Sequence, residues 1–132
     1  MILEGEVVKG GEVEGKALVT KEPISFLGGV DPETGEISER GHELEGESIK
    51  GRILVFPHGK GSTVGSYVLY QLASNGVAPA AIINRNTEAI VAVGAIIANI
   101  TLIHRLNRDP IENIKDNDYV RIQNGRIEVN EI

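Results

Sequence analysis

Short runs of apolar residues predict strands at both ends of the chain. Near the start, residues 3–8 alternate apolar with polar side chains, and residues 16–20 form a second short run after Gly10-Gly11. This arrangement predicts a hairpin-like start, because a glycine pair often forms the turn between two strands. Near the other end, five residues on each side of Asn124-Gly125 alternate in the same way. Since this dipeptide is typical of two-residue hairpin turns, we expect a β-hairpin there.

The middle of the chain predicts two buried strands, each followed by a helix. Residues 52–56 and 80–83 are compact apolar runs of the kind found in buried strands. Helix-forming residues follow at 67–73 and at 87–98, where Thr87 is a candidate cap. Apolar residues surround the second helix on nearly every side, so we expect it to be buried, partly against another chain.

The remaining segments complete the predicted architecture. Residues 101–104 predict a third short strand, whereas the polar residues 31–48, which open with Asp31-Pro32, predict a surface loop. The whole pattern describes a β-rich body with a strand, glycine loop, helix, strand and helix in succession. We therefore expect an α/β fold in the form of a β/β/α layered domain.

The composition is that of one globular domain. The chain has 132 residues, of which 41% are hydrophobic and 24% charged, so we expect a single domain over residues 1–132 with one core. The absence of cysteine excludes disulfides, thiolate zinc sites, cysteine nucleophiles and an iron–sulfur cluster held by this chain alone. The sequence shows no secretion-signal pattern, and no apolar run approaches the length of about 18 residues that a membrane-spanning helix needs. A cytoplasmic protein is therefore expected.

Charge is distributed unevenly along the chain. The net charge is −6, and an acidic chain is a poor nucleic-acid binder because that affinity depends on neutralising many phosphates. Residues 51–108, however, contain one acidic residue, Glu88, against five basic ones. This distribution permits a local positive potential over a small anion.

Reactive groups gather in the loop Gly59-Lys60-Gly61-Ser62-Thr63. Glycines let backbone N–H groups approach an anion, the following helix offers its positive end, and Lys60 adds charge, which together predict anion binding. The spacing matches neither a Walker loop nor a dinucleotide fingerprint, and Ser62 lacks the glycines of a nucleophile elbow. Ser62 is a candidate base if cationic groups and N–H donors stabilise its deprotonated oxygen. The alternative is a glycine-rich turn with a serine or threonine cap.

The other candidate groups are three histidines, an arginine and a glutamate. His58 begins the loop, so a phosphocarrier histidine is an alternative hypothesis. His42 and His104 lie far apart in the sequence without metal-ligand spacing, and no metal site is expected on this chain. Arg85 follows the second predicted buried strand, where ligands of α/β folds often bind, and is a candidate ligand contact. Glu88 is expected to pair with Arg85 or to complement a helix N-terminus.

Two stretches of the sequence resemble a known family. The first comprises EGKALV at residues 14–19 and EPISFLGGVDP at residues 22–32, with Thr34-Gly35 after it. The second is GKGSTVGS at residues 59–66. In order and spacing, these motifs resemble the small subunits of the aconitase X group, and within it the archaeal-type phosphomevalonate dehydratases. The resemblance covers nearly the whole chain.

The resemblance implies a swivelling domain that closes over a separate large subunit, as a heterodimer in which the large subunit holds a [4Fe-4S] cluster. The implied reaction is the dehydration of (R)-5-phosphomevalonate to trans-anhydromevalonate 5-phosphate in a mevalonate route to isoprenoids. Ser62 would take the proton from the carbon beside the carboxylate, while the cluster iron helps the hydroxyl leave. Lys60 and the N–H groups near Gly61 and Thr63 would stabilise the developing negative charge.

The chain departs from the group's usual pattern at two positions. Lys60 stands where arginine is common, and His58 stands where a small hydroxyl residue is common. A lysine lacks the planar fork of arginine, which disfavours a two-pronged carboxylate clamp at residue 60. Relatives that act on cis-3-hydroxyproline leave a small subunit of that dehydratase as the alternative enzyme. A non-catalytic swivelling module that binds phosphorylated ligands is the alternative from another class.

Overall fold

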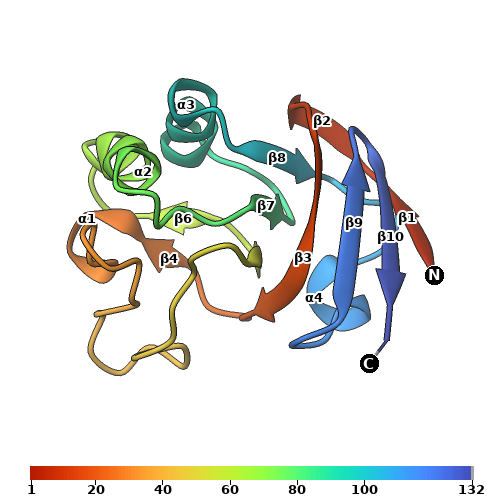
Figure 1. Cartoon of the computed structure of the whole chain (residues 1–132), viewed down its shortest axis with the longest axis horizontal. Helices are drawn as coiled ribbons and strands as arrows, with labels where there is room; N and C mark the ends of the chain where they lie inside the picture. Colours follow the sequence, from red (N-terminus) through yellow and green to blue (C-terminus); the bar gives the residue numbers. More distant parts are fainter. Residues whose placement is uncertain (132) are drawn as a thin grey trace.

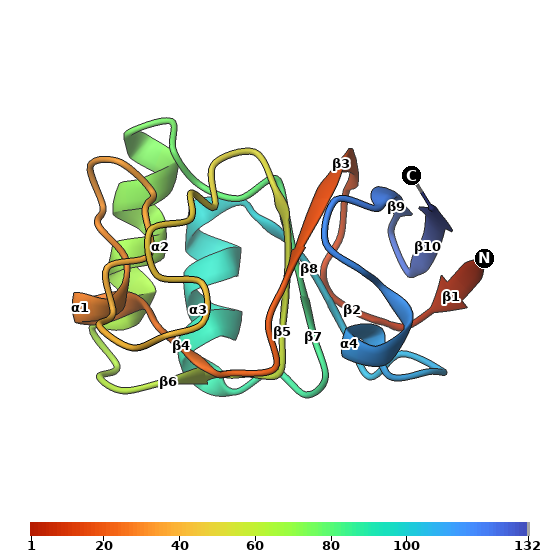
Figure 2. The same ribbon diagram turned by 90° about the horizontal axis from the view of Figure 1, so that it is seen from below.

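The protein consists of short strands and helices arranged in three layers. The computed structural model describes residues 1–131, and the elements in chain order are β1 (Ile2–Glu4), β2 (Glu6–Lys9), β3 (Glu12–Val19), β4 (Ile24–Ser25), α1 (Phe26–Gly29), β5 (Ile53–Phe56), β6 (Gly59–Lys60), α2 (Gly65–Ser74), β7 (Ala81–Asn84), α3 (Ala89–Ala98), β8 (Thr101–His104), α4 (Pro110–Asn113), β9 (Tyr119–Gln123) and β10 (Arg126–Asn130). A central layer of β5, β7 and β8 has α2 and α3 on one side and β1, β9 and β10 on the other (Figure 1, Figure 2). The predicted β/β/α layering is confirmed.

One sheet supplies both layers of strands. Its strand order is β1-β10-β9-β3-β5-β7-β8-β2. The pairs from β3 through β5 and β7 to β8 are parallel, whereas β9 pairs antiparallel with β3 and with β10. Strands β1 and β2 stand at the two ends of this order, yet only Gly5 separates them along the chain. One continuous segment therefore borders the sheet on both sides, and the sheet curls round on itself.

The predicted hairpin at the start of the chain is wrong. Strand β2 pairs with β8, and β3 pairs with β9 and β5, so the strands flanking Gly10-Gly11 are not neighbours. The glycine pair instead meets the C-terminal hairpin, whose own prediction is confirmed. Gly11 N–H donates to the side-chain oxygen of Asn124 (3.1 Å), and Asn124 N–H donates to the Gly11 carbonyl (2.9 Å). Contacts between the two ends of the chain thus override the local pattern.

The central strands bury side chains on both faces. In β5, Ile53 and Val55 point into a core between the two strand layers, whereas Leu54 and Phe56 point into a core beneath the helices. All four side chains are fully buried, as the unbroken apolar run predicts. The single core expected from the length is therefore divided in two by the sheet.

Helices α2 and α3 pack closely against each other at Gly94. A Cβ atom at this position would lie 2.5 Å from Leu69 Cδ1 and 3.1 Å from Ser66 Cα, so glycine permits the approach. Helix α3 is buried on one side only within this chain, through Val91, Gly94 and Ala95, and its expected burial against another chain stays a prediction. Val93 is 50% and Ile96 53% exposed, because both lie on the side of α3 turned away from the sheet.

The segment between α1 and β5 is more than a surface loop. Its acidic side chains face solvent, but Ile37, Leu44 and Ile49 are buried in the core beneath the helices. It begins with a turn, in which Gly35 N–H donates to the Asp31 carbonyl (2.8 Å). Within the described residues, none of the helices is long and apolar enough to cross a membrane.

Candidate active site

The loop between β5 and α2 is held against β4. Gly59 and Lys60 form β6, which runs parallel to β4 with Ile24 opposite Gly59 and Ser25 opposite Lys60. The chain then turns at Gly61, where φ is +89° and an added Cβ atom would lie 2.6 Å from Ser25 Oγ. Because side chains other than hydrogen disfavour this backbone conformation, Gly61 permits the turn that leads into α2.

Ser62 lies at the N-terminal end of α2. Its hydroxyl oxygen accepts a hydrogen bond from Val64 N–H (3.1 Å), and its carbonyl accepts one from Gly65 N–H (2.9 Å). The next carbonyl, of Thr63, accepts a bond from the Ser66 hydroxyl (2.9 Å). Ser62 and Thr63 are both exposed. The helix N-terminus favours negative charge on the Ser62 oxygen or on an anion beside it, although the same contacts also satisfy the alternative of a turn closed by serine.

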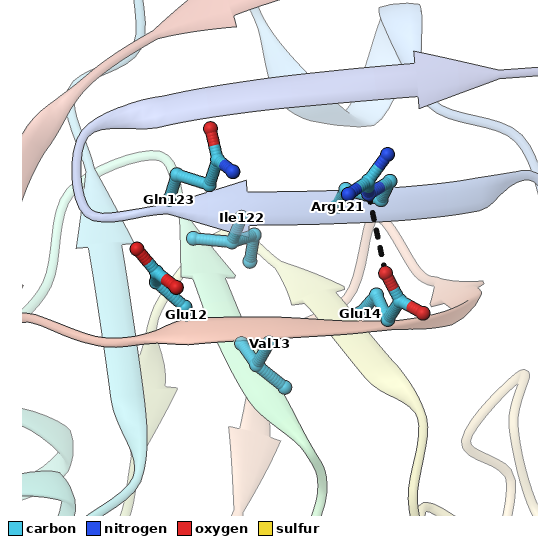
Figure 3. Close-up of a pocket in the computed structure, with 6 residues that line it drawn as sticks. All are labelled: Glu12, Val13, Glu14, Arg121, Ile122 and Gln123. Carbon is cyan, nitrogen blue, oxygen red and sulfur yellow. Dashed lines mark ion pairs between the residues drawn. The ribbon is translucent and has the colours of Figure 1, made fainter.

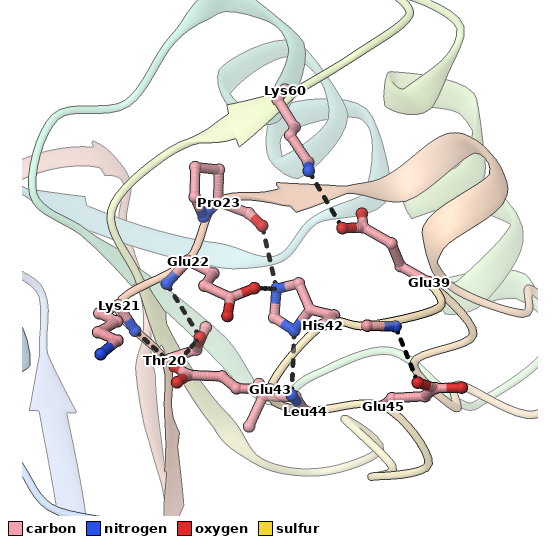
Figure 4. Close-up of polar contacts among 11 residues, drawn as sticks. Thr20, Lys21, Glu22, Pro23, Glu39, His42, Glu43, Leu44, Glu45 and Lys60 are labelled. Atoms are coloured by element: carbon pink, nitrogen blue, oxygen red, sulfur yellow. Dashed lines mark hydrogen bonds and ion pairs between the residues drawn. The ribbon is translucent and has the colours of Figure 1, made fainter.

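Lys60 is paired with an acidic residue from a distant part of the chain. Its Nζ lies 3.1 Å from Glu39 Oε2 (Figure 4). Within residues 51–108 the only acid is Glu88, but Glu39 arrives from outside this range and reduces the positive potential at the loop. Glu39 and Ser25 are site residues that the sequence pattern does not reveal, since neither belongs to the local glycine motif.

A buried histidine fixes the segment that carries Glu39. The His42 side chain is 1% exposed; its Nδ1 accepts a bond from Leu44 N–H (3.0 Å), and its Nε2 donates to the Pro23 carbonyl (3.0 Å) (Figure 4). An amide N–H only donates and a carbonyl only accepts, so the ring is neutral with its proton on Nε2. Both nitrogens are thus occupied by the backbone, and His42 is a structural residue.

Glu88 joins the loop to α3. Its carboxylate accepts bonds from Gly59 N–H (3.0 Å) and from Ile90 N–H (2.8 Å) in the first turn of the helix. The predicted Thr87 cap is therefore wrong: Glu88 is the N-cap, while the Thr87 hydroxyl donates to Asn84 Oδ1 (3.1 Å). Of the two roles expected for Glu88, the structure shows the one at a helix N-terminus, and Glu88 does not pair with Arg85.

Arg85 is turned away from this loop. Its guanidinium donates from Nε and Nη2 to the two carboxylate oxygens of Asp109, at 2.9 and 2.8 Å. This bond raises the pKa of Arg85 and lowers the pKa of Asp109. Asp109 also caps α4, which lies across the central layer from α2 (Figure 2). The structure therefore brings residues 60–63 together but leaves Arg85 outside the group, where its ligand contact stays a prediction.

The described side chains do not fit a metal ion or a cluster. His58 is exposed, and its Nδ1–H donates to the Gly59 carbonyl (2.7 Å). His104 Nδ1 accepts a bond from Thr87 N–H (2.9 Å). Across residues 1–131, no group of three or more potential ligands is placed to hold a metal. In this loop the predicted groups for chemistry are the Ser62 hydroxyl, the Lys60 ammonium and the backbone amides, and their roles stay predictions.

A groove of about 190 Å³ opens beside Thr63, the residue that follows Ser62. It lies between the N-terminal ends of α2 and α3 and is mainly apolar. Its lining residues are Thr63, Ser66, Ala89, Ile90 and Val93. Thr63 belongs to both, so the groove borders the loop at this residue.

A second hollow, of about 200 Å³, lies on the strand layers and is not part of this site. It is lined by Glu12, Val13, Glu14, Arg121, Ile122 and Gln123 (Figure 3). An ion pair between Glu14 and Arg121 (3.2 Å) bridges β3 and β9 at one end of it. These strands are separated from α2 by the central layer (Figure 1).

Comparisons with known proteins identify the family. The family model described as "Aconitase X swivel domain" matches residues 2–130. The "Phosphomevalonate dehydratase small subunit" of Methanosarcina acetivorans is 58% identical over 120 residues, which cover 91% of this chain and 83% of the relative. Its namesake in Thermococcus gammatolerans is 50% identical over 131 residues, or 98% of each chain. The crystal structure of Thermococcus kodakaraensis aconitase X (holo-form) superposes with a TM-score of 0.94 at 46% identity, covering 99% of both chains. The chain therefore belongs to the aconitase X swivel-domain family.

Proposed function

We propose that this chain is the small subunit of a phosphomevalonate dehydratase, which converts (R)-5-phosphomevalonate to trans-anhydromevalonate 5-phosphate and water. Relatives of that name match over nearly all of both chains, which supports the substrate class. The observation that carries the proposal is the placement of Ser62, exposed at the N-terminus of α2 with an N–H donor on its oxygen. The chain acts as one swivelling domain, residues 1–132, that closes over a large subunit.

In the proposed reaction, Ser62 Oγ accepts the proton from the carbon beside the substrate carboxylate. The Val64 N–H and the positive end of α2 stabilise the deprotonated oxygen before it does so. Lys60 and the backbone amides near Gly61 and Thr63 stabilise the negative charge that develops on the substrate. Lys60 must exchange Glu39 for the substrate to do this, because its ammonium is paired with that carboxylate in the free chain.

The large subunit completes the proposed site. The chain offers no cysteine for a cluster, and no group of three or more potential metal ligands lies within residues 1–131. We therefore assign the [4Fe-4S] cluster, and with it the uptake of the leaving hydroxyl, to the large subunit. The chain alone is expected to be inactive.

Anaerobic reconstitution with the large subunit of the same organism tests this proposal. Ser62→Ala should lower the turnover of the complex by about 10²- to 10⁴-fold, the usual contribution of a positioned general base. Ser74→Ala makes the same change at the opposite end of α2 and should leave turnover unchanged. Undiminished turnover by Ser62→Ala, or substantial turnover by this chain alone, would contradict the assignment. Preference for cis-3-hydroxyproline over the phosphorylated substrate would favour the related dehydratase instead.

A further inference from the structure

Helices α2 and α3 expose an apolar surface that carries no charge. Each helix has ten residues and neither contains an Asp, Glu, Lys or Arg, in a chain of which 24% is charged. Six large apolar side chains on these helices and just before α2 are between 44% and 65% exposed. We call them the helix face: Val64, Tyr67, Tyr70, Val93, Ile96 and Ile97. An apolar surface without charges is typical of the core of a protein interface.

The helix face is continuous with the groove beside Ser62. Val93 lines the groove, and Ile97 lies one turn further along the same side of α3. On α2, Ser66 lines the groove and Tyr70 follows it by one turn. The residues on α3 and those on α2 lie on either side of the close contact between the helices at Gly94. The exposed apolar surface therefore starts at the candidate active site and extends from it along both helices.

We propose that the helix face is the surface on which the large subunit docks. The inference rests on the proposed function, in which Ser62 reaches a substrate held by the large subunit. Thr63, next to Ser62, is also a wall of the groove, so a chain that delivers substrate to Ser62 must cover the groove as well. The partner surface is accordingly apolar, with hydrogen-bond acceptors for the two tyrosine hydroxyls.

Other occupants fit the helix face less well. Without a basic side chain on either helix, the face offers nothing to a nucleic acid or an anionic lipid surface. A second copy of this chain would pair the face with itself, since two-fold interfaces bring the same patch together. That arrangement would place both Ser62 loops at the same interface and close them to substrate.

The experiment measures binding of the purified chain to the large subunit by calorimetry, alongside turnover of the complex. Ile97→Glu should weaken binding at least about tenfold, because it places a charge within the proposed apolar interface. Ile2→Glu is the matched control: the same change at a similarly exposed isoleucine on β1, expected to alter binding less than about twofold. Circular dichroism establishes that each variant is folded, and Ile97→Ala replaces Ile97→Glu if the latter is not.

The outcomes separate this proposal from the proposed function. Weakened binding by Ile97→Glu, with turnover recovered at saturating concentrations of the variant, supports docking on the helix face. Binding as tight as wild type, or a larger loss in Ile2→Glu, overturns it whether or not the complex is active. If the chain instead associates with itself, and Ile97→Glu abolishes that association, the docking proposal is overturned in favour of a second copy of this chain. Loss of turnover in Ser62→Ala with intact binding supports the catalytic assignment separately, and full turnover there refutes that assignment alone.

Discussion

At the scale of single residues, the site is controlled by an ion pair between residues 21 positions apart in the sequence. Glu39 holds the Lys60 ammonium beside the Ser62 loop. The segment that carries Glu39 is anchored through buried His42, whose ring nitrogens bond to the Pro23 carbonyl and to the Leu44 N–H. An anion that approaches Lys60 in this arrangement also meets the negative charge of Glu39. The pair sets how strongly the loop attracts an anion.

Glu39→Gln should lower the KM of the reconstituted enzyme for its phosphorylated substrate. Removal of the carboxylate frees Lys60, and because exposed ion pairs contribute up to about 1 kcal/mol, we expect a decrease of roughly two- to fivefold. Glu47→Gln removes the same charge from the same segment and should leave KM unchanged. Steady-state kinetics at low ionic strength measure both. A higher KM in Glu39→Gln would show instead that Glu39 is needed to position Lys60.

His104 makes the stability of the fold depend on pH. Burial lowers its pKa, with a contribution from Arg105, and its Nδ1 accepts the Thr87 N–H that precedes α3. Since the pKa in the unfolded chain is about 6.5, the unfolded state takes up the proton first as pH falls. The stabilisation is thus complete above about pH 6.5 and is lost as pH falls towards the lower folded pKa. Urea unfolding at pH 7.5 and 5.5 should show a smaller loss in His104→Asn than in wild type, whereas exposed His58→Asn should match wild type. Equal losses in all three would contradict this role.

At the scale of elements, Glu88 joins the Ser62 loop to the start of α3. Glu88→Ala removes acceptors for the amides of Gly59 and Ile90, so we expect the free energy of unfolding to fall by about 1–2 kcal/mol. Thr87→Ala tests the cap that the sequence predicts. It should cost less, because the Thr87 hydroxyl donates its hydrogen bond to the Asn84 side chain and accepts none from the first turn of the helix. Urea denaturation measures the free energy of unfolding of both variants. A larger loss of stability in Thr87→Ala than in Glu88→Ala would show that Thr87 is the cap.

The elements that the sequence predicts correctly are those with a local cause. The apolar runs of β5 and β7 and the Asn124-Gly125 turn specify their structures through neighbouring residues, and the structure confirms them. The partner of β2 is not local, because β8 lies about a hundred residues away and any strand edge satisfies the same hydrogen bonds. The same distinction holds for the candidate site. The glycine loop can be recognised in the sequence as a motif, whereas the pairing of Glu39 with Lys60 and of Asp109 with Arg85 depends on the fold.

At the scale of the whole molecule, the central strands belong to both cores. Neighbouring residues of β7 point in opposite directions: Ile82 into the core beneath the helices, and Ile83 into the core between the strand layers. Both are fully buried. The layer with the candidate site and the layer without it therefore share one set of backbone hydrogen bonds, which favours unfolding as a single unit.

Ile82→Ala and Ile83→Ala test this coupling with the same change on opposite faces of one strand. Each variant should lose about 2–5 kcal/mol of stability, the usual cost of a cavity at a buried isoleucine. Each should still unfold in one transition, because a disordered β7 removes the support of both cores at once. Hydrogen exchange followed by mass spectrometry distinguishes the layers. If α2 and α3 of Ile82→Ala exchange well before β9 and β10, the helical layer opens by itself and the two cores are independent; exchange of all four elements together shows that the sheet transmits the damage across the molecule.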